Sequence, residues 1–203
     1  MIVDYGMGNL GSIATMLRKV GAACAISSDL AVIEAADKLI LPGVGAFDNG
    51  MKSLIERGLT QVLNAQVLKH KKPALGLCLG MQLFGRRSEE GSLTGLDWLD
   101  MQTIRFKFDG VNARLKIPHM GWNTLQIRRP HALLNDLGSD ARFYFVHSYH
   151  VVCADRENVM AETNYGYDFT SVVGRDNLFG AQFHPEKSHK FGMTLLRNFA
   201  ERI

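Results

Sequence analysis

The sequence predicts an α/β fold, built on a mostly parallel sheet flanked by helices, with a mixed or antiparallel extension. Through the first half of the chain, short apolar strands alternate with amphipathic helices, which is typical of a parallel sheet covered on both faces. From about residue 101 to residue 180, short strands separated by turns follow one another without helices. The 203 residues contain no repeat, linker or low-complexity segment, so we expect one domain over residues 1–203.

The elements follow one another from a first strand over residues 2–5. Ser12 is predicted to cap a helix that ends at Gly21 and has one apolar stripe, formed by Ile13, Met16, Leu17 and Val20. Further strands are expected over 23–26, 38–41 and 74–77, with helices over 49–57 and 59–69. In the second half we expect strands near 143–146, 159–162, 170–173 and 178–183, then a last helix from about 188. Ligands of such sheets bind beyond the carboxyl ends of the strands.

The composition of the chain argues against several classes of protein. Hydrophobic residues at 46% and charged residues at 21% are ordinary globular values, and a net charge of +3 does not indicate nucleic-acid binding. No apolar segment is long enough to cross a membrane, and no signal peptide is evident. The three cysteines (Cys24, Cys78 and Cys153) have no metal-ligand spacing and an odd count, which predicts a reducing, cytoplasmic location without disulfides.

Cys78 lies in a G-x-C-x-G motif that directly follows the apolar run 74–77. This pattern is the thiol form of the nucleophile elbow, a strained strand-to-helix turn with small residues on both sides, here Gly76 and Gly80. The helix after the turn is expected to start at Met81. A helix N-terminus beside the sulfur favours the thiolate. By itself, the motif leaves the interpretation of Cys78 as a buried core cysteine about equally open.

The segment Gln182-Phe-His184-Pro-Glu186 supplies a base and a carboxylate near the end of the chain. Residues two apart on an extended segment face the same side, so Glu186 is expected to contact His184 and fix its tautomer. A lone His184 is more simply interpreted as a core histidine, but the combination with Cys78 favours nucleophilic catalysis. His147 and His150 are predicted to face opposite sides of one strand, a poor arrangement for a metal site.

Acyl transfer also requires donors for an oxyanion. The backbone N–H of Leu79 is one candidate, and the loop Pro42-Gly-Val-Gly45 is the second, because its glycines allow unusual backbone angles. On composition alone, that loop is equally well explained as an ordinary tight turn.

Seven segments carry a resemblance to a known family. They are D-Y-G-M-G-N at 4–9, L-P-G-V-G at 41–45, G-L-C-L-G-M-Q at 76–82, S-E-E at 88–90, P-H-M-G-W-N at 118–123, Y-F-V-H-S-Y at 144–149 and Q-F-H-P-E-K at 182–187. With them the chain closely resembles class I glutamine amidotransferases, and among these the glutaminase subunits of imidazole glycerol phosphate synthases. The resemblance spans essentially the whole chain, although the first strand looks shorter than is usual in the family.

The resemblance implies that L-glutamine is the substrate and that neither a cofactor nor a metal takes part. Cys78 would attack the glutamine amide, His184 would protonate the departing ammonia, and Glu186 would orient His184. The resemblance assigns the oxyanion hole and glutamine binding to further residues, namely Leu79, Val44 and Gly45 for the former and Gly43, Gln82, Glu90, Ser148 and Tyr149 for the latter.

In the family, ammonia passes to a separate (β/α)8-barrel cyclase, which uses it in histidine biosynthesis. The positions that match partner-facing residues are Asn9, Pro118, His119, Met120, Gly121, Trp122, Asn123 and Lys187. Trp122, judged by residue type alone, is more simply a core aromatic. Two alternatives remain open: a paralogue that supplies ammonia for amidation of a bacterial surface sugar, and an inactive amidotransferase-like scaffold.

Overall fold

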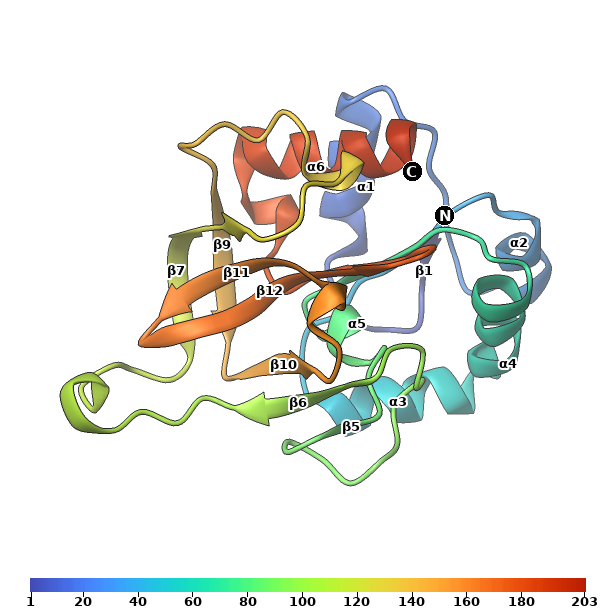
Figure 1. Cartoon of the computed structure of the whole chain (residues 1–203). Coiled ribbons are helices and arrows are strands. Elements are labelled where there is room, and N and C mark those ends of the chain that lie inside the picture. Colours follow the sequence, from blue (N-terminus) through green and yellow to red (C-terminus); the bar gives the residue numbers. More distant parts are fainter.

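The computed structural model describes residues 1–203, which form layers of helices around an 11-stranded sheet (Figure 1). Five strands form its parallel part, in the spatial order β2 (Ile26–Ser27), β1 (Ile2–Val3), β3 (Leu39–Leu41), β4 (Ala74–Leu77) and β13 (Leu178–Ala181). The parallel sheet predicted for the first half is therefore confirmed, and it is completed by a strand from the far end of the chain.

Beyond β13 the sheet continues mainly with antiparallel strands. The path runs through β12 (Tyr167–Arg175), β10 (Tyr149–Cys153), β6 (Met101–Arg105) and β5 (Arg87–Ser88), and β11 (Val159–Tyr165) joins β12 and β8 (Gln126–Ile127). Two strands, β7 (His119–Thr124) and β9 (Arg142–His147), pair antiparallel in a separate small sheet. The predicted mixed extension is confirmed.

Helices cover both faces of the parallel strands, and successive strand residues point to opposite cores. Val3, Leu39 and Leu41 join one apolar cluster, whereas Ile2 and Ile40 join the other. The first cluster lies under four helical elements: α2 (Leu30–Ala35), α3 (Phe47–Glu56), α4 (Leu59–Asn64) and the π-helical turn η1 (Ala65–Lys69). The second cluster lies under α1 (Leu10–Lys19) and α6 (His189–Arg202), and these two helices lie together in Figure 1. One-turn elements complete the chain: α5 (Leu79–Gln82), η2 (Gly110–Asn112), η3 (Ala132–Leu134), η4 (Arg156–Asn158) and η5 (Pro185–Lys187).

Several local expectations were wrong. The N-cap of α1 is Asn9 and not Ser12, because the Asn9 side chain accepts the N–H of Ser12 (3.4 Å) and the helix begins at Leu10. The second strand is formed by residues 26–27 instead of 23–26. The short helix α2 was not predicted, although Asp29 caps it by accepting the N–H of Val32 (3.0 Å).

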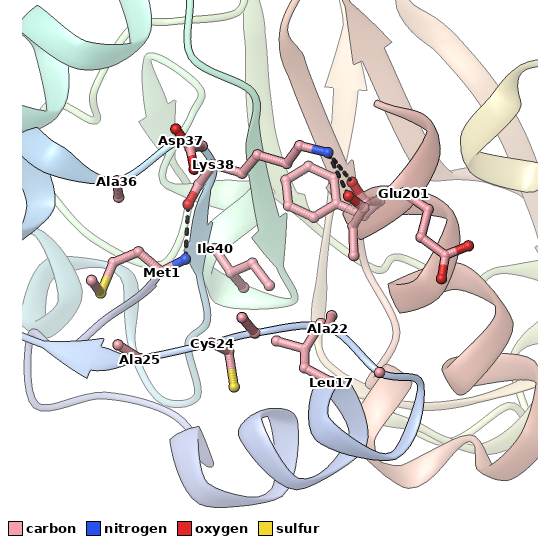
Figure 2. A pocket seen from close by; sticks show the side chains of 14 residues that line it. Met1, Leu17, Ala22, Cys24, Ala25, Ala36, Asp37, Lys38, Ile40 and Glu201 are labelled. Carbon is pink, nitrogen blue, oxygen red and sulfur yellow. Dashed lines mark hydrogen bonds between the residues drawn. The ribbon is translucent and has the colours of Figure 1, made fainter.

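At the amino ends of the parallel strands lies a cavity of about 550 Å³ with walls that include Leu17, Ile40 and Phe199 (Figure 2). The terminal ammonium of Met1 donates to the carbonyl of Lys38 (2.9 Å). The Lys38 ammonium in turn donates to two carbonyls in the last turn of α6. None of the predicted site residues lines this cavity. Many of them line a second cavity, which lies beyond the carboxyl ends of the strands. No helix in the structure has the length and apolar character needed to span a membrane.

Candidate active site

Cys78 occupies a strained turn between β4 and α5. Its φ of 52° and ψ of −109° belong to a region that residues other than glycine seldom adopt. A Cβ at Gly76 would lie 2.6 Å from the nitrogen of Met81, and one at Gly80 would lie 1.8 Å from the carbonyl oxygen of Leu41. The requirement for small residues on both sides of the nucleophile is therefore confirmed.

The helix after Cys78 differs from the expectation. It begins at Leu79 instead of Met81 and has only one turn. It ends at Gln82, and just beyond it the carbonyl of Phe84 accepts the N–H groups of Trp98 (2.9 Å) and Leu99 (3.0 Å). As the first helical residue, Leu79 retains a backbone N–H without an intrahelical acceptor, as an oxyanion donor requires.

His184 and Glu186 contact each other as expected, with 2.9 Å between Nδ1 and a carboxylate oxygen. The predicted backbone was wrong, however, because residues 185–187 form the 3₁₀ turn η5 instead of continuing an extended segment. The turn is held by Ser188, which donates its hydroxyl to the His184 carbonyl (2.6 Å) and accepts the N–H of Tyr144 (3.0 Å). Ser188 was not identified from the sequence as a residue that shapes the site.

The electrostatics of His184 favour its protonated form. Burial by itself would lower the pKa of His184, but interactions with Cys78 and with the Glu186 carboxylate raise that pKa to about 10. The Nε2 atom of His184 is buried and makes no hydrogen bond of ordinary geometry, although the Cys78 thiol contributes to the pKa. A His184 imidazolium with a free Nε2–H near Cys78 stabilises the Cys78 thiolate and can later deliver a proton.

Besides Cys78, His184 and Glu186, the site contains a fourth polar side chain, Gln182, which contacts the sulfur. Gln182, fully buried, donates Nε2 to Sγ of Cys78 (3.6 Å) and accepts Nε2 of Gln82 on its Oε1 (3.1 Å). The sequence pattern placed Gln182 beside His184 but indicated no role for it, because its distance from Cys78 along the chain hides the contact.

A cavity of about 630 Å³ opens at the carboxyl ends of the strands, and Cys78 and His184 both line it. The residues predicted for glutamine binding and the oxyanion hole lie around the same cavity, with one exception; they are Val44, Gly45, Leu79, Gln82, Glu90, Ser148 and Tyr149. Glu90 also accepts the N–H of Phe47 (2.9 Å), which ties its carboxylate to the segment just after Gly45.

The exception is Gly43, which lines a narrow crevice with His184 and Glu186 instead of the cavity. A Cβ at Gly43 would lie 2.5 Å from the Tyr5 hydroxyl and 2.8 Å from Cβ of Leu79, so this position requires glycine for close packing. The Tyr5 hydroxyl donates to the Pro42 carbonyl (2.5 Å) and anchors the start of the loop. Gly45 has a φ of +109°, which is the backbone freedom expected of this loop.

Five of the eight residues expected to face a partner are exposed, two are half-buried and one is buried. Asn9, Pro118, Met120, Trp122 and Lys187 are exposed, so the interpretation of Trp122 as a core aromatic was wrong. Trp122 lies on the outer side of β7 and stacks on the ring of His189 (5.4 Å between centroids). Gly121 and Asn123 are half-buried.

His119 is buried instead of facing outward, because alternate residues of β7 point inward toward β11 and β12. The expected orientation of His147 and His150 was also wrong. The strands β9 and β10 are interrupted at Ser148, and both rings pack against Phe106, at 5.3 Å and 4.7 Å between centroids. Burial lowers the pKa values of His119 and His150 to about 4 and that of His147 to about 3, so all three are neutral near pH 7.

Comparison with known proteins supports one family throughout. The family model described as glutamine amidotransferase class-I matches residues 1–203. The chain is 50% identical to "Imidazole glycerol phosphate synthase subunit HisH 2" of Pseudomonas aeruginosa, over 100% of this chain and 99% of the relative. It is also 50% identical to the subunit of the same name from Methanococcus maripaludis, over 99% and 98% of the two chains. Identity to the HisH subunit of Leptospira borgpetersenii is 44%, over 98% of each chain.

Solved structures agree on the fold at low sequence identity. A glutamine amidotransferase from Thermotoga maritima aligns with a TM-score of 0.69 at 17% identity, over 99% of this chain and 95% of that chain. The structure of PurLQS from the same organism aligns with a TM-score of 0.70 at 16% identity, over 98% and 95% of the two chains. With the match to the family model over its whole length, the chain belongs to the class I glutamine amidotransferase family.

Proposed function

We propose that this chain is the glutaminase subunit of an imidazole glycerol phosphate synthase, which hydrolyses L-glutamine and supplies ammonia to a synthase partner. The observation that carries the proposal is that Cys78 and His184 line one cavity and Glu186 bonds His184, in a chain with full-length relatives that bear that name. The intact pair of buried His184 and Glu186 argues against the inactive scaffold.

The first half of the reaction forms a thioester. The thiolate of Cys78 attacks the carboxamide carbon of glutamine, and a carbon–sulfur bond forms while negative charge moves onto the amide oxygen. The N–H of Leu79, with an N–H from residues 44–45, supplies the donors for that oxyanion. His184 then gives its Nε2 proton to the amide nitrogen, and ammonia leaves as the carbon–nitrogen bond breaks.

The second half regenerates the thiolate. His184, now neutral, takes a proton from water as the water oxygen attacks the thioester carbonyl. The carbon–sulfur bond breaks, glutamate leaves, and the thiolate–imidazolium pair is restored. Glu186 holds the Nδ1 proton of His184 throughout (2.9 Å), so that Nε2 always faces the reacting atoms.

The partner in this proposal is a (β/α)8-barrel cyclase that docks beside β7 and consumes the ammonia. Support comes from the apolar side chains of Met120 and Trp122, which are exposed. Pro118 and Lys187, which are also expected to face the partner, line the cavity that contains Cys78. All three cysteines are free, and a thiol nucleophile must remain reduced, so we expect the complex to work in the cytoplasm.

The test is to purify the chain with the barrel subunit of its source organism and to measure glutamate release and ammonia incorporation. We expect both to require Cys78, while synthesis from added ammonium salts does not. Incorporation from glutamine by a Cys78→Ala complex at the wild-type rate would reject the proposal.

A second function has one observation in its favour. Several relatives bear a number in their names: subunit 2 in P. aeruginosa and M. maripaludis, and subunit 1 in Campylobacter jejuni. Such numbering fits organisms that contain more than one subunit of this type, one of which can serve another acceptor, such as a bacterial surface sugar. Capture of the partner from the source cell decides: a histidine-pathway cyclase supports the first function, and a sugar-modifying synthase supports the second.

A further inference from the structure

Side chains on the inner face of β7 and at the end of β9 form a series of hydrogen bonds in which each donor and acceptor can be assigned. The Oδ1 of Asn123 accepts the N–H of Thr124 (2.9 Å), so its Nδ2 is the group that faces His119 Nε2 (3.3 Å). His119 Nδ1 lies 3.2 Å from His147 Nε2, and His147 Nδ1 lies 2.7 Å from the carbonyl oxygen of Tyr149. Because a carbonyl only accepts, His147 donates to Tyr149, and His119 therefore donates to His147.

From the Tyr149 carbonyl the bonds continue to the sulfur. Gln82 donates Nε2 to this carbonyl (3.2 Å) and to Oε1 of Gln182 (3.1 Å), which uses both of its N–H bonds. Gln182 directs its Nε2 at the sulfur of Cys78 (3.6 Å). A thiolate can only accept hydrogen bonds, so it requires the N–H side of this amide to face it. With its nitrogen occupied, the amide of Gln82 has only Oε1 available for a ligand in the cavity that it lines.

We propose that this set of groups, which we call the relay (Asn123, His119, His147, the Tyr149 carbonyl, Gln82 and Gln182), positions the Gln82 oxygen for substrate and an N–H for Cys78. His119 is then a positioning residue, since it acts through His147 and Tyr149, whereas Gln182 contacts the reacting sulfur itself. The relay selects a ligand group that donates hydrogen bonds at Gln82, such as an amide or an ammonium. This inference rests on the proposed glutaminase function.

A matched pair of variants separates this role from general packing. The His119 ring stacks on Phe145 and Tyr165 (4.9 Å and 4.1 Å between centroids) and does not line the cavity, so His119→Phe keeps an aromatic ring but removes the donor to His147. His150 lies in the same aromatic group, bonds Tyr167 (3.0 Å) and has no place in the relay, so His150→Phe is the control.

The assay uses the complex with the synthase partner. We expect His119→Phe to raise the KM for glutamine about five- to tenfold with little change in kcat, as the loss of one buried hydrogen bond implies. His119→Asn, which has an amide N–H to replace Nδ1–H, is expected to recover most of that loss. His150→Phe should leave KM at the wild-type value, and co-elution of the two subunits in size-exclusion chromatography should show that each complex is assembled.

The sulfur end is tested without substrate, by the rate at which iodoacetamide alkylates Cys78. Gln182→Glu replaces an N–H donor by a carboxylate, and we expect alkylation to slow by about tenfold or more. Gln182→Met keeps the length without any donor and is expected to slow alkylation less. Wild-type alkylation rates in both Gln182 variants, or equal KM values for His119→Phe and His150→Phe, would overturn the relay. Absent glutamine turnover in the wild type would instead reject the proposed function, and the alkylation rates would still test the relay.

Discussion

Replacement of Glu186 by Gln keeps the shape of the side chain but removes the charge that stabilises the His184 imidazolium. The pKa of His184 is raised from 6.5 to about 10 although burial opposes the charge. This difference corresponds to about 5 kcal/mol, which Cys78 and Glu186 supply together. Glu186→Gln removes the Glu186 part of this interaction, so it lowers the pKa of His184 and weakens the thiolate–imidazolium pair.

The assay is steady-state glutamine hydrolysis by the complex with its partner. We expect kcat/KM to fall by about 10–10² in Glu186→Gln. His184→Ala should fall further, by about 10²–10⁴, because it removes the group that carries the proton. If Glu186→Gln proved more impaired than His184→Ala, the roles of the two residues would be reversed and the reasoning refuted.

A stability measurement provides an independent check, with a definite sign. His184 binds its proton more tightly in the folded chain, so this stabilisation is complete below pH 6.5 and is lost as the pH rises toward about 10. Within that window the group lowers the free energy of unfolding by about 1.4 kcal/mol per pH unit. Urea unfolding at neutral and alkaline pH should show a smaller loss for Glu186→Gln than for the wild type, and identical losses would contradict the pKa argument.

Three more perturbations test the nucleophile, the oxyanion loop and the buried histidines. Cys78→Ala should abolish glutamine-dependent synthesis, measured as product formation, while synthesis from ammonium salts persists. The isolated chain should be a poor glutaminase that its liganded partner activates about 10²–10³-fold through rotation of a peptide beside Gly45; Gly45→Pro should block the response, seen as equal rates with and without partner. Acidification should destabilise the chain, because His119, His147 and His150 have folded-state pKa values of about 4, 3 and 4. As the pH falls from 6.5 toward those values, each histidine lowers the free energy of unfolding by about 1.4 kcal/mol per pH unit. Urea unfolding should therefore show a smaller loss of stability on acidification in His150→Phe than in the wild type.

Features that depend on residues close together in the chain could be predicted from the sequence. Gly76 and Gly80 mark the strained turn because steric exclusion around Cys78 involves the adjacent strand and turn. His184 and Glu186 are two residues apart, so their contact needed only a local bend, although the bend is a 3₁₀ turn instead of an extended segment. The alternation of strands and helices likewise indicated the parallel sheet without knowledge of distant contacts.

Which side chains face inward, and what they contact across the fold, depends on long-range strand pairing and could not be predicted from the sequence. The pairing of β7 with β9 in a separate small sheet exposes Trp122 and buries His119, and no residue-type preference distinguishes these outcomes. The break at Ser148 brings His147 and His150 to the same aromatic group. Gln182 contacts Cys78 only because β13 pairs in parallel with β4, so that two segments about a hundred residues apart end side by side. Such contacts depend on strand order and register, which the pattern of any single segment does not contain.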